Sequence, residues 1–263
     1  MNYFMLALFC AGSICNAFGE GSKNRGNDSV AAFLACPDFP CRKAIEGLRA
    51  KKFAKRISLD TKKFESKEGP GLEFSSHKLT LNNGTQVKFV GAMSKIESDQ
   101  GLYLFFDLLE RSDYFIFYVQ HTETSYFVLV SGKTGQEYNS ENGHFLCDAP
   151  PIPSPDGQKI LCMNGTSSQA PAMDPSDGQL LAVWDLGSAE PKLGWSIKQK
   201  DWDAKNMRWV GPNQIHFERV SWVAKSSDTF AEFEPKPIGS ACLKLENGKW
   251  VLRTFGLNEK SGC

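Results

Sequence analysis

Short runs of alternating apolar and polar residues fill most of the chain beyond residue 70. Residues 72–96 hold two such runs on either side of Asn82-Asn83-Gly84, a composition typical of a two-stranded hairpin with a tight turn. The next three runs, at 101–109, 113–120 and 125–136, are rich in aromatic and β-branched residues and are separated by polar turns. This spacing predicts an antiparallel meander.

The same pattern continues through the second half of the chain. Strand-like runs occupy residues 178–188, 192–198, 206–223 and 229–235, and residues 240–256 form a predicted hairpin that turns at Asn247-Gly248. Turns recur about every 8–12 residues without helical periodicity, which is typical of a sandwich, barrel or propeller. We therefore expect residues 63–263 to form an all-β domain, either propeller-like or another multi-sheet antiparallel architecture.

Residues 29–62 differ from this pattern. They contain helix formers and seven basic residues between Arg42 and Arg56, against one acid, Glu46. A short helix here would carry one apolar stripe, composed of Ala44, Ile45 and Leu48. Two interpretations stay open: a basic helix that meets an anionic surface or partner, and a solvated helix packed over one end of the β domain.

The first residues predict export. Residues 1–17 are apolar, without a charged side chain, and end in Cys15-Asn16-Ala17, small residues suited to cleavage by a signal peptidase. An uncleaved membrane anchor and a buried N-terminal strand are the alternatives. We expect a signal peptide over 1–17, a flexible leader over 18–28, and a periplasmic or secreted protein without an integral membrane segment after cleavage.

The cysteines agree with export. Cleavage after Ala17 leaves an even number, as is typical of disulfide-bonded exported proteins: Cys36, Cys41, Cys147, Cys162, Cys242 and Cys263. Local spacing favours the pairs Cys36–Cys41, Cys147–Cys162 and Cys242–Cys263 among the possible connectivities. A metal site is not expected, because the sequence has no Cys-x-x-Cys pair and its four histidines lack zinc-ligand spacing.

One segment carries a family resemblance. Thr134-Gly135 ends a strand-like run, and Ser154-Pro155-Asp156-Gly157 with Lys159 and Ile160 opens the next. This arrangement resembles TolB-like and WD40-like β-propeller repeats over about residues 120–225, with a weaker echo at Trp209 and Gly211-Pro212-Asn213. The resemblance implies propeller blades, although four clean repeats are absent. In the motif itself we expect a structural turn that sends Ile160 into the core.

Charge and motifs reduce the number of function classes that fit the sequence. Lys and Arg number 30, as do Asp and Glu, so the net charge of zero gives no general attraction to nucleic acid. No P-loop, dinucleotide fingerprint or nucleophile elbow is present, and we predict no catalytic residues and no cofactor. His77, His121, His144 and His216 are expected at the surface or at strand edges. Asp174–Gly178 is expected to form a tight turn rather than a calcium site.

Candidate binding residues come from the tryptophans, all of which lie in the second half. Trp202 is flanked by Asp201 and Asp203 and is the one we expect to be exposed, where with Trp209 it would anchor a partner. Packing in the core is the alternative. Three glycosylation sequons also occur, at Asn27, Asn83 and Asn164.

These features favour an exported recognition protein that binds another protein. A periplasmic inhibitor and an immunity-type protein are examples of this class. The alternative is a glycan- or ester-active hydrolase on a propeller-like scaffold. Such an enzyme would use loop carboxylates placed at the right separation, with Asp148, Asp174, Asp201 and Asp203 as the candidates.

Overall fold

The structure is a computed structural model that describes residues 36, 39–66, 69–93, 102–120, 125–139, 147–164, 179–224 and 233–259. The predicted signal peptide and leader, residues 1–28, lie outside this range, as do His121, His144 and Asp174. Antiparallel sheets dominate, so the expected all-β, multi-sheet fold class is confirmed.

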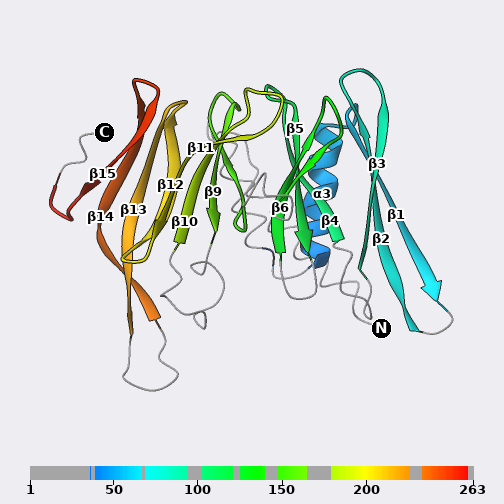
Figure 1. Cartoon of the computed structure of the whole chain (residues 1–263). Coiled ribbons are helices and arrows are strands. Elements are labelled where there is room, and N and C mark those ends of the chain that lie inside the picture. The colour runs from blue at the N-terminus through cyan, green and yellow to red at the C-terminus, as the bar shows by residue number, and fades with distance from the viewer. Residues whose placement is uncertain are drawn as a thin grey trace. The chain divides into compact units, whose positions relative to one another are not determined.

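Four sheets and one helix make up the described part of the chain (Figure 1). The helix is α3 (Phe39–Lys52). The first sheet contains β1 (Ile57–Ser66), β2 (Gly69–Thr80) and β3 (Gln86–Met93), and the second contains β4 (Leu102–Leu109), β5 (Tyr114–Gln120), β6 (Ser125–Ser131) and β7 (Glu137–Tyr138). The third contains β8 (Ile152–Pro153), β9 (Lys159–Asn164), β10 (Gln179–Asp185) and β11 (Lys192–Gln199). The fourth contains β12 (Asp203–Gly211), β13 (Gln214–Ala224), β14 (Phe233–Glu246) and β15 (Lys249–Phe255).

Within each sheet, neighbouring strands are consecutive in the sequence. Each sheet is therefore an up-and-down meander, as the turn spacing predicts. Three of the sheets have four strands, which is the strand number of a propeller blade. Other multi-sheet folds use the same meander, so the propeller stays a prediction.

The chain divides into two compact units, Met1–Asp107 and Leu108–Cys263. Helix α3 belongs to the first unit together with β1–β3. Strand β1 begins at Ile57, inside the segment 29–62 that the sequence indicated as helical and basic. The helical character ends at Lys52.

The predicted apolar stripe of α3 is wrong in part. Ile45 is buried, but Ala44 is exposed and the Leu48 side chain is 53% exposed. The buried positions are instead Ile45, Glu46 and Ala50. A carboxylate therefore occupies a core position of this helix, and burial of a carboxylate demands close polar partners.

Glu46 finds those partners on two strands of the same unit. Its Oε1 lies 2.6 Å from His77 Nε2 on β2 and accepts a hydrogen bond of 2.7 Å from the backbone N–H of Phe105 on β4. His77 is only 1% exposed, so its expected place at a surface or strand edge is wrong. Arg49, one turn further along α3, donates to the Phe106 carbonyl at 2.7 Å. The helix is thus held by buried polar contacts rather than by apolar packing alone.

The Ser-Pro-Asp-Gly motif is the turn that joins β8 to β9. Ser154 Oγ donates to Asp156 Oδ1 at 2.6 Å, the Gln158 N–H donates to the same oxygen, and Gly157 has φ of +64°. Burial alone would raise the pKa of Asp156, but these hydrogen bonds and nearby cations lower it below its usual range. Ile160 follows and is fully buried. The motif's expected structural role is confirmed.

A shared apolar core joins the third and fourth sheets. Its buried members come from β9, β10, β12, β13 and β14 and from the residue before β12: Leu161, Leu181, Val183, Trp202, Ala204, Ile215, Phe217, Ala241 and Leu243. Because β-strand side chains alternate between faces, these residues place one face of the fourth sheet against the core.

The Cys147–Cys162 disulfide is confirmed, with Cα atoms 5.0 Å apart. It connects the segment that precedes β8 to buried strand β9. Cys36 and Cys242 are also disulfide-bonded. The Cys41 side chain and Cys263 lie outside the described residues, so their predicted pairings with Cys36 and Cys242 stay predictions.

Removal of the Cys147–Cys162 bridge is expected to lower the free energy of unfolding by about 3 kcal/mol, because the bridge closes a loop with a sequence separation of 15. The test compares urea unfolding of the wild type with a Cys147→Ala/Cys162→Ala double variant. A midpoint that does not shift would contradict the stabilising role of this bridge.

Candidate recognition surface

The fourth sheet differs from the second sheet in how its strands are buried. Strands β5 and β6 are buried along nearly their whole length, so side chains of both faces are covered. Strands β12 and β15 instead carry exposed positions along much of their length. One face of this sheet packs on the core, and the opposite face carries exposed charged positions, although Cys242 within it is buried.

The register of the fourth sheet identifies which side chains share that opposite face. Arg208 pairs with His216, His216 pairs with Cys242, and Cys242 pairs with Arg253, which makes one row across all four strands. Directly opposed residues lie on the same face of a sheet. The rows on either side add Lys205, Glu218, Gln214, Ser240, Lys244, Val251 and Phe255, and the outermost pairs add Glu246 with Lys249 and Asp203 with Val220.

Positive charge dominates this surface, which we call the cationic face. Its five cations outnumber its three carboxylates, Glu218, Glu246 and the buried Asp203, by two. The cations are Lys205, Arg208, Lys244, Lys249 and Arg253. The chain as a whole has zero net charge, so the excess is a local asymmetry of one sheet face.

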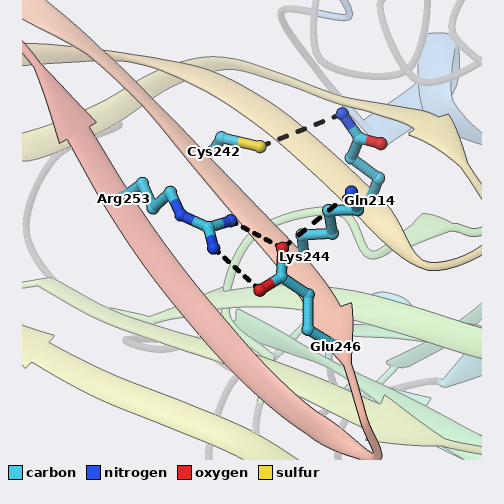
Figure 2. Close-up of polar contacts among 5 residues, drawn as sticks. All are labelled: Gln214, Cys242, Lys244, Glu246 and Arg253. Carbon is cyan, nitrogen blue, oxygen red and sulfur yellow. Dashed lines mark hydrogen bonds and ion pairs between the residues drawn. The ribbon is translucent and has the colours of Figure 1, made fainter. Parts of the chain in front are cut away.

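Figure 2 shows the part of this face built by the β14–β15 hairpin. Arg253 donates two hydrogen bonds of 2.7 Å to the two carboxylate oxygens of Glu246, and Lys244 Nζ lies 3.9 Å from Glu246 Oε1. The hydrogen bonds from Arg253 lower the pKa of Glu246 and raise the pKa of Arg253. One carboxylate is therefore shared by two cations, and the local charge stays positive.

Neutral polar groups continue the face along β13. Gln214 Nε2 donates to Cys242 Sγ at 3.9 Å, and Asn206 Nδ2 donates to Glu218 Oε2 at 2.7 Å (Figure 2 shows the first). Lys205 Nζ lies 4.7 Å from the ring centroid of Trp222. Cross-strand pairing fixes the spacing of these groups, so they form a semi-rigid array.

The expected exposure of Trp202 is wrong. Trp202 is 8% exposed, stacks on Phe217 with ring centroids 5.8 Å apart, and belongs to the core cluster. Asp203 is also buried, because the Trp222 indole N–H donates to its Oδ2. Asp201 is exposed. The three neighbours therefore do not form one exposed group: burial of the indole outweighs the polar character of its neighbours in sequence.

Trp209 is half-buried and uses its polar atom inside the protein. Its indole N–H donates to the Ile152 carbonyl at 2.8 Å, and its ring meets the Trp250 ring edge-on with centroids 6.2 Å apart. These contacts place Trp209 against the core that joins the third and fourth sheets. Its role in binding stays a prediction.

The candidate carboxylates of a hydrolase lie in different surroundings. Asp148 is exposed near the Cys147–Cys162 bridge, Asp201 is exposed before β12, and Asp203 is engaged by Trp222. Across the described ranges, no group of three or more His, Cys, Asp and Glu side chains is placed to hold a metal ion.

No protein-family profile matches this chain, and no curated protein sequence matches it. Within the ranges that the structure describes, no helix combines the length and apolar character needed to cross a membrane.

Sequence reasoning missed the cationic face because its cations are dispersed from residue 205 to residue 253. A partial signal was available before the Asn247-Gly248 turn, where the charged residues Lys244 and Glu246 alternate with the apolar residues Leu243 and Leu245. The alignment of the four strands, which unites the charges, comes only from the register.

Proposed function

We propose that this protein is an exported, disulfide-bonded recognition protein that binds another protein through the cationic face. The observation that carries the proposal is the excess of two positive charges on the face of the β12–β15 sheet opposite the core, in a chain of zero net charge. The partner presents an acidic surface, because complementary charge steers association and selects against basic competitors.

Rigidity supports the same function. The face is formed by hydrogen-bonded strands whose opposite side packs on the core, and β14 carries the disulfide-bonded Cys242. A preorganised array loses little conformational entropy when a partner docks, so more of the contact energy remains as affinity. The Cys147–Cys162 bridge suits a protein that works outside the reducing cytosol.

The hydrolase alternative gains no support from the carboxylates that suggested it. A glycosidase needs two carboxyl groups that face one substrate bond. Asp203 instead accepts a hydrogen bond from Trp222 in a buried site, and Asp148 and Asp201 are exposed on separate segments. The fourth candidate, Asp174, lies outside the described residues.

The test uses the full chain as bait in an extracytoplasmic extract, followed by a titration with the purified partner. An Arg208→Ala/Lys244→Ala double variant is expected to bind roughly tenfold more weakly, since each charge contributes about 0.2–1 kcal/mol. Added salt is expected to weaken wild-type binding more steeply than binding of the double variant, because screening removes the same attraction.

The matched control is Lys192→Ala/Lys198→Ala, which removes two exposed lysines from β11 of the third sheet. This variant loses the same net charge but leaves the cationic face intact, so its affinity is expected to stay near that of the wild type. Equal binding by both double variants would show that the cationic face is not the recognition surface.

A further inference from the structure

The three glycosylation sequons fall in different surroundings. Asn27-Asp28-Ser29 lies outside the described residues, Asn83-Gly84-Thr85 lies at the turn between β2 and β3, and Asn164 ends β9. A glycan attached to asparagine must project into solvent in the folded protein, because buried sugar hydroxyls would lose their hydrogen bonds to water. Burial therefore separates usable sequons from unusable ones.

Asn83 lies at the tip of an exposed hairpin. Every residue from Asn82 to Gln86 is exposed. Gly84 has φ of +82° and donates its N–H to the Leu81 carbonyl, and the Leu81 N–H donates to the Thr85 carbonyl at 2.8 Å. A Cβ built on Gly84 would meet no atom within 4 Å, so the space beside the asparagine is open. The turn is ordered by its backbone and still accessible.

The asparagine side chain is oriented by the residue that completes the sequon. Asn83 Oδ1 accepts a hydrogen bond of 2.9 Å from the Thr85 N–H, which is an Asx turn. This bond uses the oxygen of the amide and leaves its nitrogen, Nδ2, outside the contact. Nδ2 is the atom to which a glycan is attached.

Asn164 has the opposite surroundings. It is 7% exposed, lies in β9 opposite Leu180 of β10, and accepts a hydrogen bond of 2.8 Å from the Asp148 N–H. Its Nδ2 atom is buried, so a glycan attached there would have to displace the neighbouring strands of the third sheet. The sequence motif is present, but the fold excludes its use.

We propose that Asn83 is an N-glycan acceptor. The inference rests on the proposed export, since the sugar is transferred in the secretory compartment. The donor is an oligosaccharide carried on a polyprenyl diphosphate. The Asn83 Nδ2 attacks the anomeric carbon, a carbon–nitrogen bond forms, and the carbon–oxygen bond to the diphosphate breaks. The polyprenyl diphosphate leaves with that electron pair, and one Nδ2 proton passes to a base of the transferase.

The test expresses the full chain in a eukaryotic secretory host in two forms. One form keeps residues 1–17, and the other replaces them with a signal sequence of the host. Protein from the medium is treated with a peptide-N-glycosidase in water labelled with heavy oxygen, and the peptide masses are measured. The enzyme converts a glycosylated Asn83 to labelled Asp, whereas spontaneous deamidation of the Asn83-Gly84 pair before treatment gives unlabelled Asp. We expect the conversion at Asn83 and no conversion at Asn164.

Variants of the turn test whether modification of Asn83 depends on the sequon and not only on the exposure of the asparagine. Asn83→Gln and Thr85→Ala are expected to abolish the conversion, whereas Thr85→Ser keeps the hydroxyl and is expected to retain it. A Lys249→Thr variant creates a matched sequon at Asn247, in the other exposed Asn-Gly hairpin turn, and reports that the host modifies such turns.

The two forms distinguish a failure of export from a failure of the site. If the native form stays in the cell while the form with the host signal is secreted and glycosylated at Asn83, only the export prediction fails. Secreted protein whose Asn83 carries no glycan overturns the proposal, and a glycan on Asn164 overturns the burial argument that selects Asn83.

Discussion

Replacement of Glu46 by alanine is expected to lower the free energy of unfolding of the first unit by about 3–5 kcal/mol. The change leaves His77 Nε2 and the Phe105 N–H without the oxygen that both contact, at positions that water does not reach. The expected cost is large because a buried polar group left without its partner keeps its full desolvation penalty. Hydrogen exchange of the β2 amides in the native protein measures the loss.

Two variants of the same helix act as controls. Glu46→Gln keeps an amide oxygen that accepts from the Phe105 N–H but removes the charge, so a smaller loss is expected. Leu48→Ala truncates an apolar side chain that is 53% exposed, and its effect is expected to stay within about 0.5 kcal/mol. Equal exchange rates in Glu46→Ala and Leu48→Ala would mean that the buried pair does not hold α3.

Trp202→Ala is the second variant with a large expected effect, a loss of about 3–5 kcal/mol in the free energy of unfolding of the second unit. The substitution removes the ring that stacks on Phe217 and opens a cavity in the core between the third and fourth sheets. The Arg219 guanidinium, 5.9 Å from the Trp202 ring centroid, loses its aromatic neighbour as well. Urea unfolding followed by tryptophan fluorescence measures the change.

This variant also decides between the two interpretations of Trp202. A core residue lowers stability when truncated, and partner binding by the fraction that remains folded is unchanged. An exposed anchor would lower affinity and leave the unfolding midpoint nearly unchanged. Asp201→Ala is the neighbouring control, since Asp201 is exposed and is expected to change stability by less than about 0.5 kcal/mol.

Local patterns of the sequence predict much of the fold. The Asn247-Gly248 turn is a clear example: both residues have positive φ, 50° and 77°, and Glu246 pairs directly with Lys249 across it. Asn and Gly are the residues that tolerate this geometry, and strand alternation on either side sets the hairpin. The same reasoning holds for the Gly84 hairpin and for the turn at Asp156-Gly157, because each depends on residues within a few positions.

The candidate surface depends on contacts that local patterns do not encode. Arg208, His216, Cys242 and Arg253 form one row only after three strand registers are set. A shift of one residue in any of these pairings would move the affected side chains to the opposite face. The composition gives a net charge of zero and hides the asymmetry, so the surface could not be predicted before the strands were aligned.

The order of the amino acids was enough to establish strands, turns and their succession, because backbone preferences and side-chain alternation act over a few residues. It was also enough to predict the Cys147–Cys162 bridge from spacing. Packing decided which polar residues are buried and which charges share a face. Glu46 lies in the core because His77 and the Phe105 N–H contact its carboxylate there, and Trp202 is buried because its ring stacks on Phe217. Such partners are distant in sequence, and only the folded chain brings them together.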